Sequence, residues 1–200
     1  GQETAAAPQT RIPSDEIVLR ASHLSGSILR DVSFHVRRGE SFGITGLLDA
    51  GKTELLNILS GMKTKYQGQI FVGEREVFFS GPYDAMKYGI GYAPEDRNTY
   101  GFIPSMTVKE NVTLSSLKRV STLGWIHRKG ERYFAEQFLK LLEAGGLNQR
   151  SYLKELSAGQ QQQVQIAKCL APHPRIMLMD EPDKGMDIVS KEDILSLIHI

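Results

Sequence analysis

The segment GLLDAGKT, residues 46–53, has the spacing G-x-x-x-x-G-K-[ST]. In such a segment, glycines allow backbone N–H groups to approach phosphate oxygens, and the helix that follows adds the positive end of its dipole. We expect Lys52 to reach the β- and γ-phosphates and the Thr53 hydroxyl to coordinate Mg²⁺. The predicted triphosphate site comprises Gly46, Leu47, Leu48, Asp49, Ala50, Gly51, Lys52, Thr53 and Glu54.

A second segment, RIMLMDE at residues 175–181, is an apolar run that ends in two carboxylates. Asp180 is expected to hold Mg²⁺ through water, and Glu181 to polarise an attacking water. Two acids after a strand are by themselves more typical of a solvated loop. Combined with residues 46–53, they predict a catalytic site, with Glu181 and Lys52 as the catalytic residues.

A third segment, LSAGQQQQ at residues 156–163, contains Ser157 three positions before Gln160. This spacing is a capping box, so a helix should begin at Ser157, with Val164, Ala167 and Leu170 on its buried side. The serine hydroxyl and the helix dipole predict a second anion-binding surface.

The elements that must position these segments alternate between strands and helices. Residues 16–26 and 28–48 predict an N-terminal β region, which ends in a buried strand at residues 42–48. A helix follows, ending near Gly61. Its buried stripe consists of Leu55, Leu56, Ile58 and Leu59.

Later segments complete an α/β pattern. Residues 68–82 predict a hairpin, residues 82–89 a short helix, and residues 176–179 a second buried strand. Residues 108–153 are helical and charged, and we expect one stripe there to contain Phe134, Phe138, Leu141 and Leu142.

Composition limits the class of protein. The chain has 200 residues, 40% of them hydrophobic, enough for one domain with a small second lobe. Its net charge of +1 provides no electrostatic surface for nucleic acid. No apolar run approaches the roughly 18 residues that span a bilayer, so we expect a soluble intracellular chain.

The two ends have unusual composition. Residues 1–15 are rich in Ala, Pro, Gln and Thr, which indicates a linker or a disordered start. Residues 195–200, LSLIHI, allow two interpretations: a truncated native helix, or a sequencing artefact from a library transposon end.

The order of the three segments resembles the nucleotide-binding domain of ATP-binding-cassette (ABC) proteins, over about residues 16–194. The resemblance implies an α/β P-loop NTPase core of ABC type with an N-terminal antiparallel β region, an inserted helical subdomain at about residues 105–155, and truncation at the C-terminus. In that family the signature segment contacts ATP held by a partner cassette. The signature here would be Ser157, Ala158, Gly159 and Gln160, and the remaining glutamines would lie on the helix surface near that interface.

Finer motifs are similar to those of monosaccharide importers of the ribose, galactose and xylose type, in particular their second cassette. They include residues 91–114, where Glu95 occupies a metal position that is Gln in most cassettes. This resemblance implies ATP and Mg²⁺ as cofactors and ATP hydrolysis that energises sugar import. It also implies two direct partners: a second cassette in the same or a sister chain, and a permease that contacts residues 92–106 including Phe102. A sugar-binding protein would be an indirect partner, and no nucleic acid is expected. The chain would lie peripherally on the cytoplasmic face of the inner membrane.

Some residues depart from the family pattern. Asp49 stands where a small residue is usual, and two like charges about 4 Å apart repel by roughly 4 kcal/mol at an effective dielectric of 20. We therefore expect Asp49 to point away from phosphate, in a left-handed conformation that Asp tolerates. Residues 19–27 lack the aromatic that many cassettes stack on adenine, so base selectivity should be loose.

Two other functions stay open. One is a regulatory nucleotide-binding cassette with weak hydrolysis, which Asp49 and Glu95 favour; a less favoured one is a soluble ABC ATPase without a transport role. All three functions require Lys52 and Asp180 to lie on the same side of the molecule, with Ser157 accessible to a neighbour.

Overall fold

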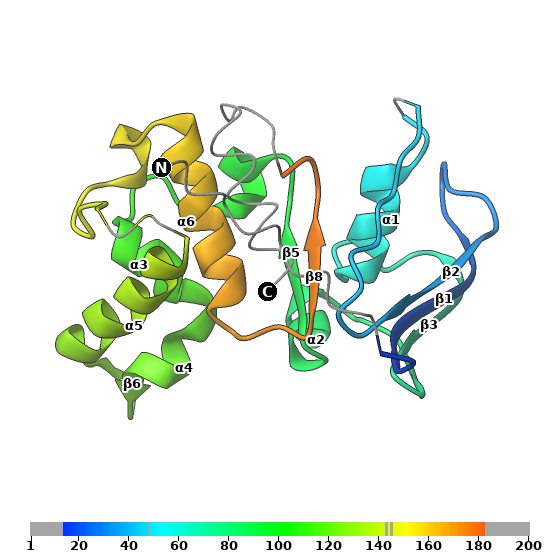
Figure 1. Cartoon of the computed structure of the whole chain (residues 1–200), viewed down its shortest axis with the longest axis horizontal. Helices are drawn as coiled ribbons and strands as arrows, with labels where there is room; N and C mark the ends of the chain where they lie inside the picture. The colour runs from blue at the N-terminus through cyan, green and yellow to red at the C-terminus, as the bar shows by residue number, and fades with distance from the viewer. Residues whose placement is uncertain (1–13, 48, 143, 145, 183–200) are drawn as a thin grey trace, which may run out of the picture.

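The computed structural model describes residues 14–47, 49–142, 144 and 146–182. Its N-terminal part is a four-stranded antiparallel sheet in the order β2-β1-β3-β4 (Figure 1). The strands are β1 (Ile17–Ser25), β2 (Val32–Arg37), β3 (Gln67–Val72) and β4 (Arg75–Val77). The predicted antiparallel β region and the hairpin within residues 68–82 are therefore confirmed.

The central part contains a pair of parallel strands flanked by helices (Figure 1). Its elements are α1 (Lys52–Leu59), α2 (Pro82–Lys87), β5 (Ile90–Ala93) and β8 (Ile176–Met179). All four apolar residues of the predicted α1 stripe are buried, and they pack with the sheet residues Leu19, Leu24 and Ile70 in a first hydrophobic core. Burial of such a stripe is what holds a helix as short as α1 in place.

A helical part lies on the other side of β5 and β8 (Figure 1). It contains η1 (Arg97–Gly101), α3 (Val108–Thr113), η2 (Leu114–Ser116), α4 (Leu117–Val120), β6 (Ser121–Thr122), β7 (Trp125–Ile126), α5 (Arg128–Leu141), η3 (Leu153–Glu155) and α6 (Ala158–Leu170). A second core joins Val108, Phe138, Leu139 and Val164. Helix α6 contacts both this part and β5, so it connects the two cores.

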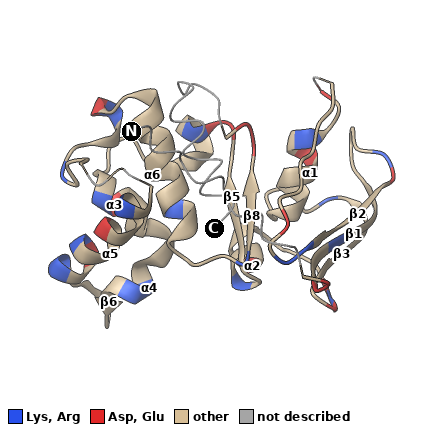
Figure 2. Ribbon diagram, viewed as in Figure 1, with Lys and Arg blue, Asp and Glu red and all other residues tan. Residues whose placement is uncertain are grey.

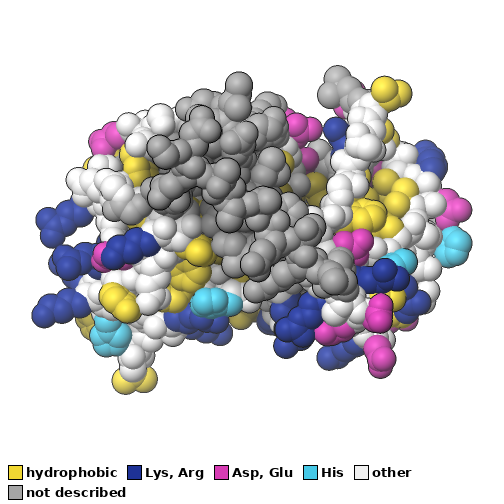
Figure 3. All heavy atoms as spheres, in the orientation of Figure 1, with side chains coloured by type: hydrophobic (Ala, Val, Ile, Leu, Met, Phe, Trp, Pro, Cys, Tyr) yellow, Lys and Arg dark blue, Asp and Glu magenta, His cyan; other side chains and the backbone are white. Residues whose placement is uncertain are grey.

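The predicted strand at residues 42–48 was wrong over the residues that the structure describes. Residues 42–47 form no strand, and Phe42 and Leu47 are 45% and 84% exposed. Phe42 stacks on Phe34, with ring centroids 5.1 Å apart. Figure 3 shows hydrophobic side chains on the surface beside α1. A strand needs a hydrogen-bonding neighbour, and no described segment pairs with this run.

The predicted stripe of α5 was wrong at Leu141. Leu141 is 45% exposed, whereas Leu139 is 1% exposed and lies in the second core with Phe138 and Leu142. The helix ends at Leu141. Among the helices that the structure describes, none has the length and hydrophobicity needed to cross a bilayer.

Candidate functional site

The loop before α1 has the backbone conformation expected of an anion-binding turn. Asp49 and Gly51 both have positive φ, at 60° and 91°, so the expected left-handed conformation of Asp49 is present. Gly51 is the N-cap of α1, and no side chain among the described residues caps this helix. The first N–H groups of α1 are thus free of side-chain acceptors, which suits a phosphate. Leu48 lies outside the described residues.

The acidic residues gather beside this loop because β5 and β8 are parallel. Their carboxyl ends lie at one edge, where Figure 2 shows acidic segments at the upper ends of both strands. Glu95 comes two residues after β5, and Asp180 and Glu181 follow β8 directly. The Lys52 Nζ atom lies 3.4 Å from Glu181 Oε1. Lys52 and Asp180 are therefore on the same side of the molecule.

Asp180 is the most buried of these carboxylates, at 6% exposure. Burial raises its pKa, a hydrogen bond with Thr53 lowers it, the charges of Glu95 and Glu181 raise it further, and Lys52 opposes them. The net direction is upward. Its Oδ2 atom is buried and has no hydrogen-bond partner among the described residues. A buried acceptor without a donor is costly, so this atom is suited to a metal-bound water.

The described residues contain no group of three or more His, Cys, Asp or Glu side chains that could hold a metal ion unaided. The carboxylates at this edge and the Thr53 hydroxyl nonetheless fit Mg²⁺, which typically takes one or two carboxylates together with phosphate oxygens and waters. Glu181 also has a positive φ of 48°, which is uncommon for a residue other than glycine. Strain of this kind is frequent at functional sites.

Ser157 begins α6 as predicted. Its Oγ accepts from the Gln160 N–H at 3.3 Å, and Gln160 Oε1 accepts from the Ser157 N–H at 3.1 Å. Ser157 and Ala158 are exposed and Gly159 is half-buried, so this helix start is accessible to a neighbour. Val164 and Ala167 are buried on the opposite side, and Leu170 packs against the second core.

The expectation that the remaining glutamines lie on the helix surface was wrong for Gln162, which is buried, whereas Gln161 and Gln163 are half-buried. Gln161 Nε2 donates to Leu153 O at 3.0 Å, and Gln163 Nε2 donates to Leu142 O at 3.3 Å. Gln162 is 4% exposed, and its Nε2 donates to Pro182 O at 3.2 Å. Helix α6 is covered on most sides, and glutamine supplies the donors that buried carbonyl groups require.

Sequence reasoning missed a link between α6 and the segment that follows β5. Gln162 Oε1 accepts from Arg97 Nη1 at 3.0 Å, and fully buried Gln165 donates from Nε2 to Pro94 O at 2.8 Å. These residues flank Glu95 and so connect the Ser157 helix to the acidic edge. The spacing of Gln162 and Gln165, which places both on one helix face, was the available signal.

The interpretation of Phe102 as a partner-contacting residue was also wrong, because it is 5% exposed within the second core. Tyr100, which is 59% exposed, lines a cavity of about 230 Å³ instead. The other lining residues include Met62, Pro82, Met86, Tyr92 and Lys168. Lys168 donates to Gly101 O at 2.8 Å, and burial lowers its pKa.

Known proteins are similar to this chain in sequence. The ribose import ATP-binding protein RbsA of Caldanaerobacter subterraneus subsp. tengcongensis is 39% identical over 94% of this chain and 38% of its own length. RbsA of Rhodopirellula baltica is 38% identical over 93% of this chain and 38% of its own length. The chain thus spans less than two fifths of these curated relatives.

Solved structures agree in fold. The ATP-binding cassette MJ1267 of an ABC transporter superposes with a TM-score of 0.78 at 25% identity, covering 92% of this chain and 76% of that one. A dimeric post-hydrolysis structure of the cassette MJ0796 with ADP and Pi gives 0.76 at 26% identity, covering 90% and 81%. Residues 29–184 match the family model described as ABC transporter. The α/β cassette fold is confirmed, and the chain belongs to the ABC transporter family.

Proposed function

We propose that the chain binds ATP with Mg²⁺ and hydrolyses it, and that hydrolysis energises sugar import through a transmembrane permease. The observation that carries the proposal is the meeting of the loop at residues 46–53 with Asp180 and Glu181 at one edge, where Lys52 Nζ is 3.4 Å from Glu181 Oε1. The family match and the ribose import relatives support it.

Each residue has a distinct task in this proposal. The N–H groups of residues 46–53 and the Lys52 ammonium bind the triphosphate oxygens, and Mg²⁺, when bound, supplies further positive charge. The Thr53 hydroxyl and Asp180 would hold the metal, Asp180 through a water, and Glu95 lies close enough to affect the Asp180 pKa. Glu181 orients the attacking water and accepts its proton.

The ion pair between Lys52 and Glu181 implies that nucleotide binding precedes the formation of the hydrolytic site. Both side chains are partly exposed, at 31% and 46%, so the pair is weak and readily replaced. When phosphate oxygens replace Glu181 as the ion-pair partner of Lys52, the Glu181 carboxylate becomes free to bind water. Nucleotide binding thereby assembles the hydrolytic site.

The substitution Glu181→Gln tests the proposal, because it keeps the size of the side chain and removes the base. We expect ATP binding to persist in calorimetry while phosphate release falls sharply. Loss of binding together with hydrolysis would show that Glu181 holds the nucleotide rather than the water.

The partners belong to the same proposal. The exposed start of α6, Ser157 to Gln160, contacts ATP held by a second cassette in the same or a sister chain. Residues 92–106 and the cavity beside Tyr100 contact the permease, which places the chain peripherally on the cytoplasmic face of the membrane. The domain extends over residues 16–194, with its helical subdomain at about 105–155; residues 183–194 lie outside the described part.

Exposed Tyr100 replaces Phe102 as the residue that tests permease contact. In the assembled transporter, Tyr100→Ala should reduce sugar uptake and leave basal ATP hydrolysis unchanged. Unchanged sugar uptake would show that the permease does not contact this surface.

One observation favours the regulatory alternative. The site gathers Glu95, Asp180 and Glu181 around Lys52, and Asp49 adds a further carboxylate to the loop. This excess of negative charge would slow catalysis at the γ-phosphate. Hydrolysis that is equally slow in the Glu181→Gln variant and the unsubstituted chain would support a regulatory cassette.

A further inference from the structure

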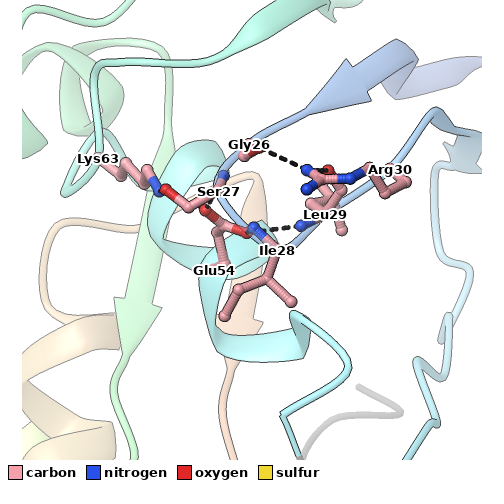
Figure 4. A network of polar contacts seen from close by, with 7 residues as sticks. All are labelled: Gly26, Ser27, Ile28, Leu29, Arg30, Glu54 and Lys63. Carbon is pink, nitrogen blue, oxygen red and sulfur yellow. Dashed lines mark hydrogen bonds and ion pairs between the residues drawn. The ribbon is translucent and has the colours of Figure 1, made fainter.

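Glu54 directly follows Thr53 in the first turn of α1, yet it is only 9% exposed. Its carboxylate contacts a loop that is far away in the sequence (Figure 4). Glu54 Oε1 accepts from the Ser27 N–H at 2.7 Å. Glu54 Oε2 accepts from the N–H groups of Ile28 and Leu29 at 2.8 and 2.7 Å. Three consecutive backbone donors thus converge on one carboxylate.

Lys63 completes this network. Its ammonium pairs with Glu54 Oε1 and donates to Ser27 Oγ at 2.7 Å. Charge-assisted hydrogen bonds of this kind are roughly twice as strong as neutral ones. Gly26 allows the close approach, since a Cβ at that position would lie 2.6 Å from Glu54 Oε1.

The loop that Glu54 holds lies against the phosphate-binding turn. A Cβ on Gly51 would lie 3.5 Å from Leu29 N and 3.6 Å from Ile28 Cγ2. The Ile28 side chain remains 53% exposed. Residues 27–29 are therefore a wall beside the turn, and Ile28 presents an apolar surface there.

We propose that Glu54 is a positioning residue, which fixes residues 27–29 so that Ile28 contacts the nucleoside end of a nucleotide bound at residues 46–53. The inference rests on the proposed ATP binding. The γ-phosphate end of the nucleotide is assigned to the side of Asp180 and Glu181. Residues 27–29, which lie beside Gly51, are therefore placed to contact the remainder of the ligand. A carboxylate is required because glutamine would turn an amide N–H toward donors.

The experiment compares two ligands in the full chain: Mg·ATP, and Mg·tripolyphosphate, which lacks a nucleoside. Isothermal calorimetry measures both dissociation constants for the unsubstituted chain and for Glu54→Gln. We expect Glu54→Gln to weaken ATP binding about tenfold, the effect of losing about one hydrogen bond to a charged group. Tripolyphosphate binding should change less than about twofold, because its contacts lie within the turn.

Two further variants sharpen the comparison. Exposed Ile28→Ser does not disturb the core and should reproduce the selective loss of ATP affinity, so it decides the matter if Glu54→Gln does not fold. Glu74→Gln, at an exposed position near the β3–β4 turn, is the matched control and should leave both constants unchanged.

The outcomes separate the two proposals. If the unsubstituted chain binds neither ligand, the proposed function fails and this inference fails with it. If it binds both ligands but Glu54→Gln and Ile28→Ser bind ATP normally, only this inference is overturned. Equal weakening of ATP and tripolyphosphate in Glu54→Gln would also overturn it, since Glu54 would then merely support the turn.

Discussion

The Glu54 network predicts a specific acid sensitivity of the folded chain. Burial raises the pKa of Glu54, but hydrogen bonds from Lys63 and from the N–H groups of Leu29, Ile28 and Ser27 outweigh it, and the pKa falls from 4.5 to about 2. At 1.36 kcal/mol per pKa unit, the ionised Glu54 stabilises the fold by roughly 3 kcal/mol.

This stabilisation is fully present above pH 4.5, the ordinary pKa of the unfolded state, and is lost as the pH falls toward 2. Urea unfolding at a series of pH values between 7 and about 2.5 measures it. Glu54→Gln removes the titrating group. The difference in the free energy of unfolding between the two proteins should therefore be constant above about pH 5 and shrink by roughly 2–3 kcal/mol below it.

Other carboxylates with lowered pKa, such as Glu110, titrate in both proteins and cancel in this difference. Glu74→Gln, at an exposed position near the β3–β4 turn, is the control for the Glu-to-Gln substitution itself. Parallel curves for Glu54→Gln and the unsubstituted chain would refute the assignment of a strongly bound carboxylate at Glu54.

Three further predictions follow from the same structure. Glu181→Gln should lower phosphate release by about 10²- to 10⁴-fold, measured at saturating Mg·ATP; a loss below about threefold would contradict its role as base. Ser157→Arg should abolish ATP-dependent dimerisation in analytical ultracentrifugation without changing monomer ATP affinity; an unaltered dimer would exclude the α6 start from the interface. ATP and GTP should bind within about tenfold of each other, because an apolar wall at Ile28 offers no hydrogen bond that reads the base; a hundredfold preference in calorimetry would contradict this.

Local patterns were sufficient for much of the fold. The four apolar residues of α1 and the capping box at Ser157 depend on neighbours within one or two helical turns, so their spacing predicted them. The strand at residues 176–179 is an apolar run whose neighbour, β5, is present. Residues 42–47 also predicted a buried strand but form none, because pairing depends on a segment elsewhere in the chain.

The candidate site divides in the same way. The loop at residues 46–53 and the acids after β8 are each a short continuous motif, and the sequence predicted that the two lie together. The partners of the α6 glutamines include the backbone carbonyls of Pro94, Leu142 and Leu153, which sequence spacing does not reveal. Glu54 was assigned to the nucleotide by its position in the motif, whereas its side chain bonds residues 27–29.

A crystal structure of the chain with Mg²⁺ and a non-hydrolysable ATP analogue tests whether residues 46–53 and the acids after β8 form one nucleotide site. We expect that the γ-phosphate contacts Lys52 Nζ in place of Glu181, and that the metal lies between the Thr53 hydroxyl and a water held by Asp180. A nucleotide bound elsewhere, or one bound at residues 46–53 with Lys52 still paired to Glu181, would contradict it.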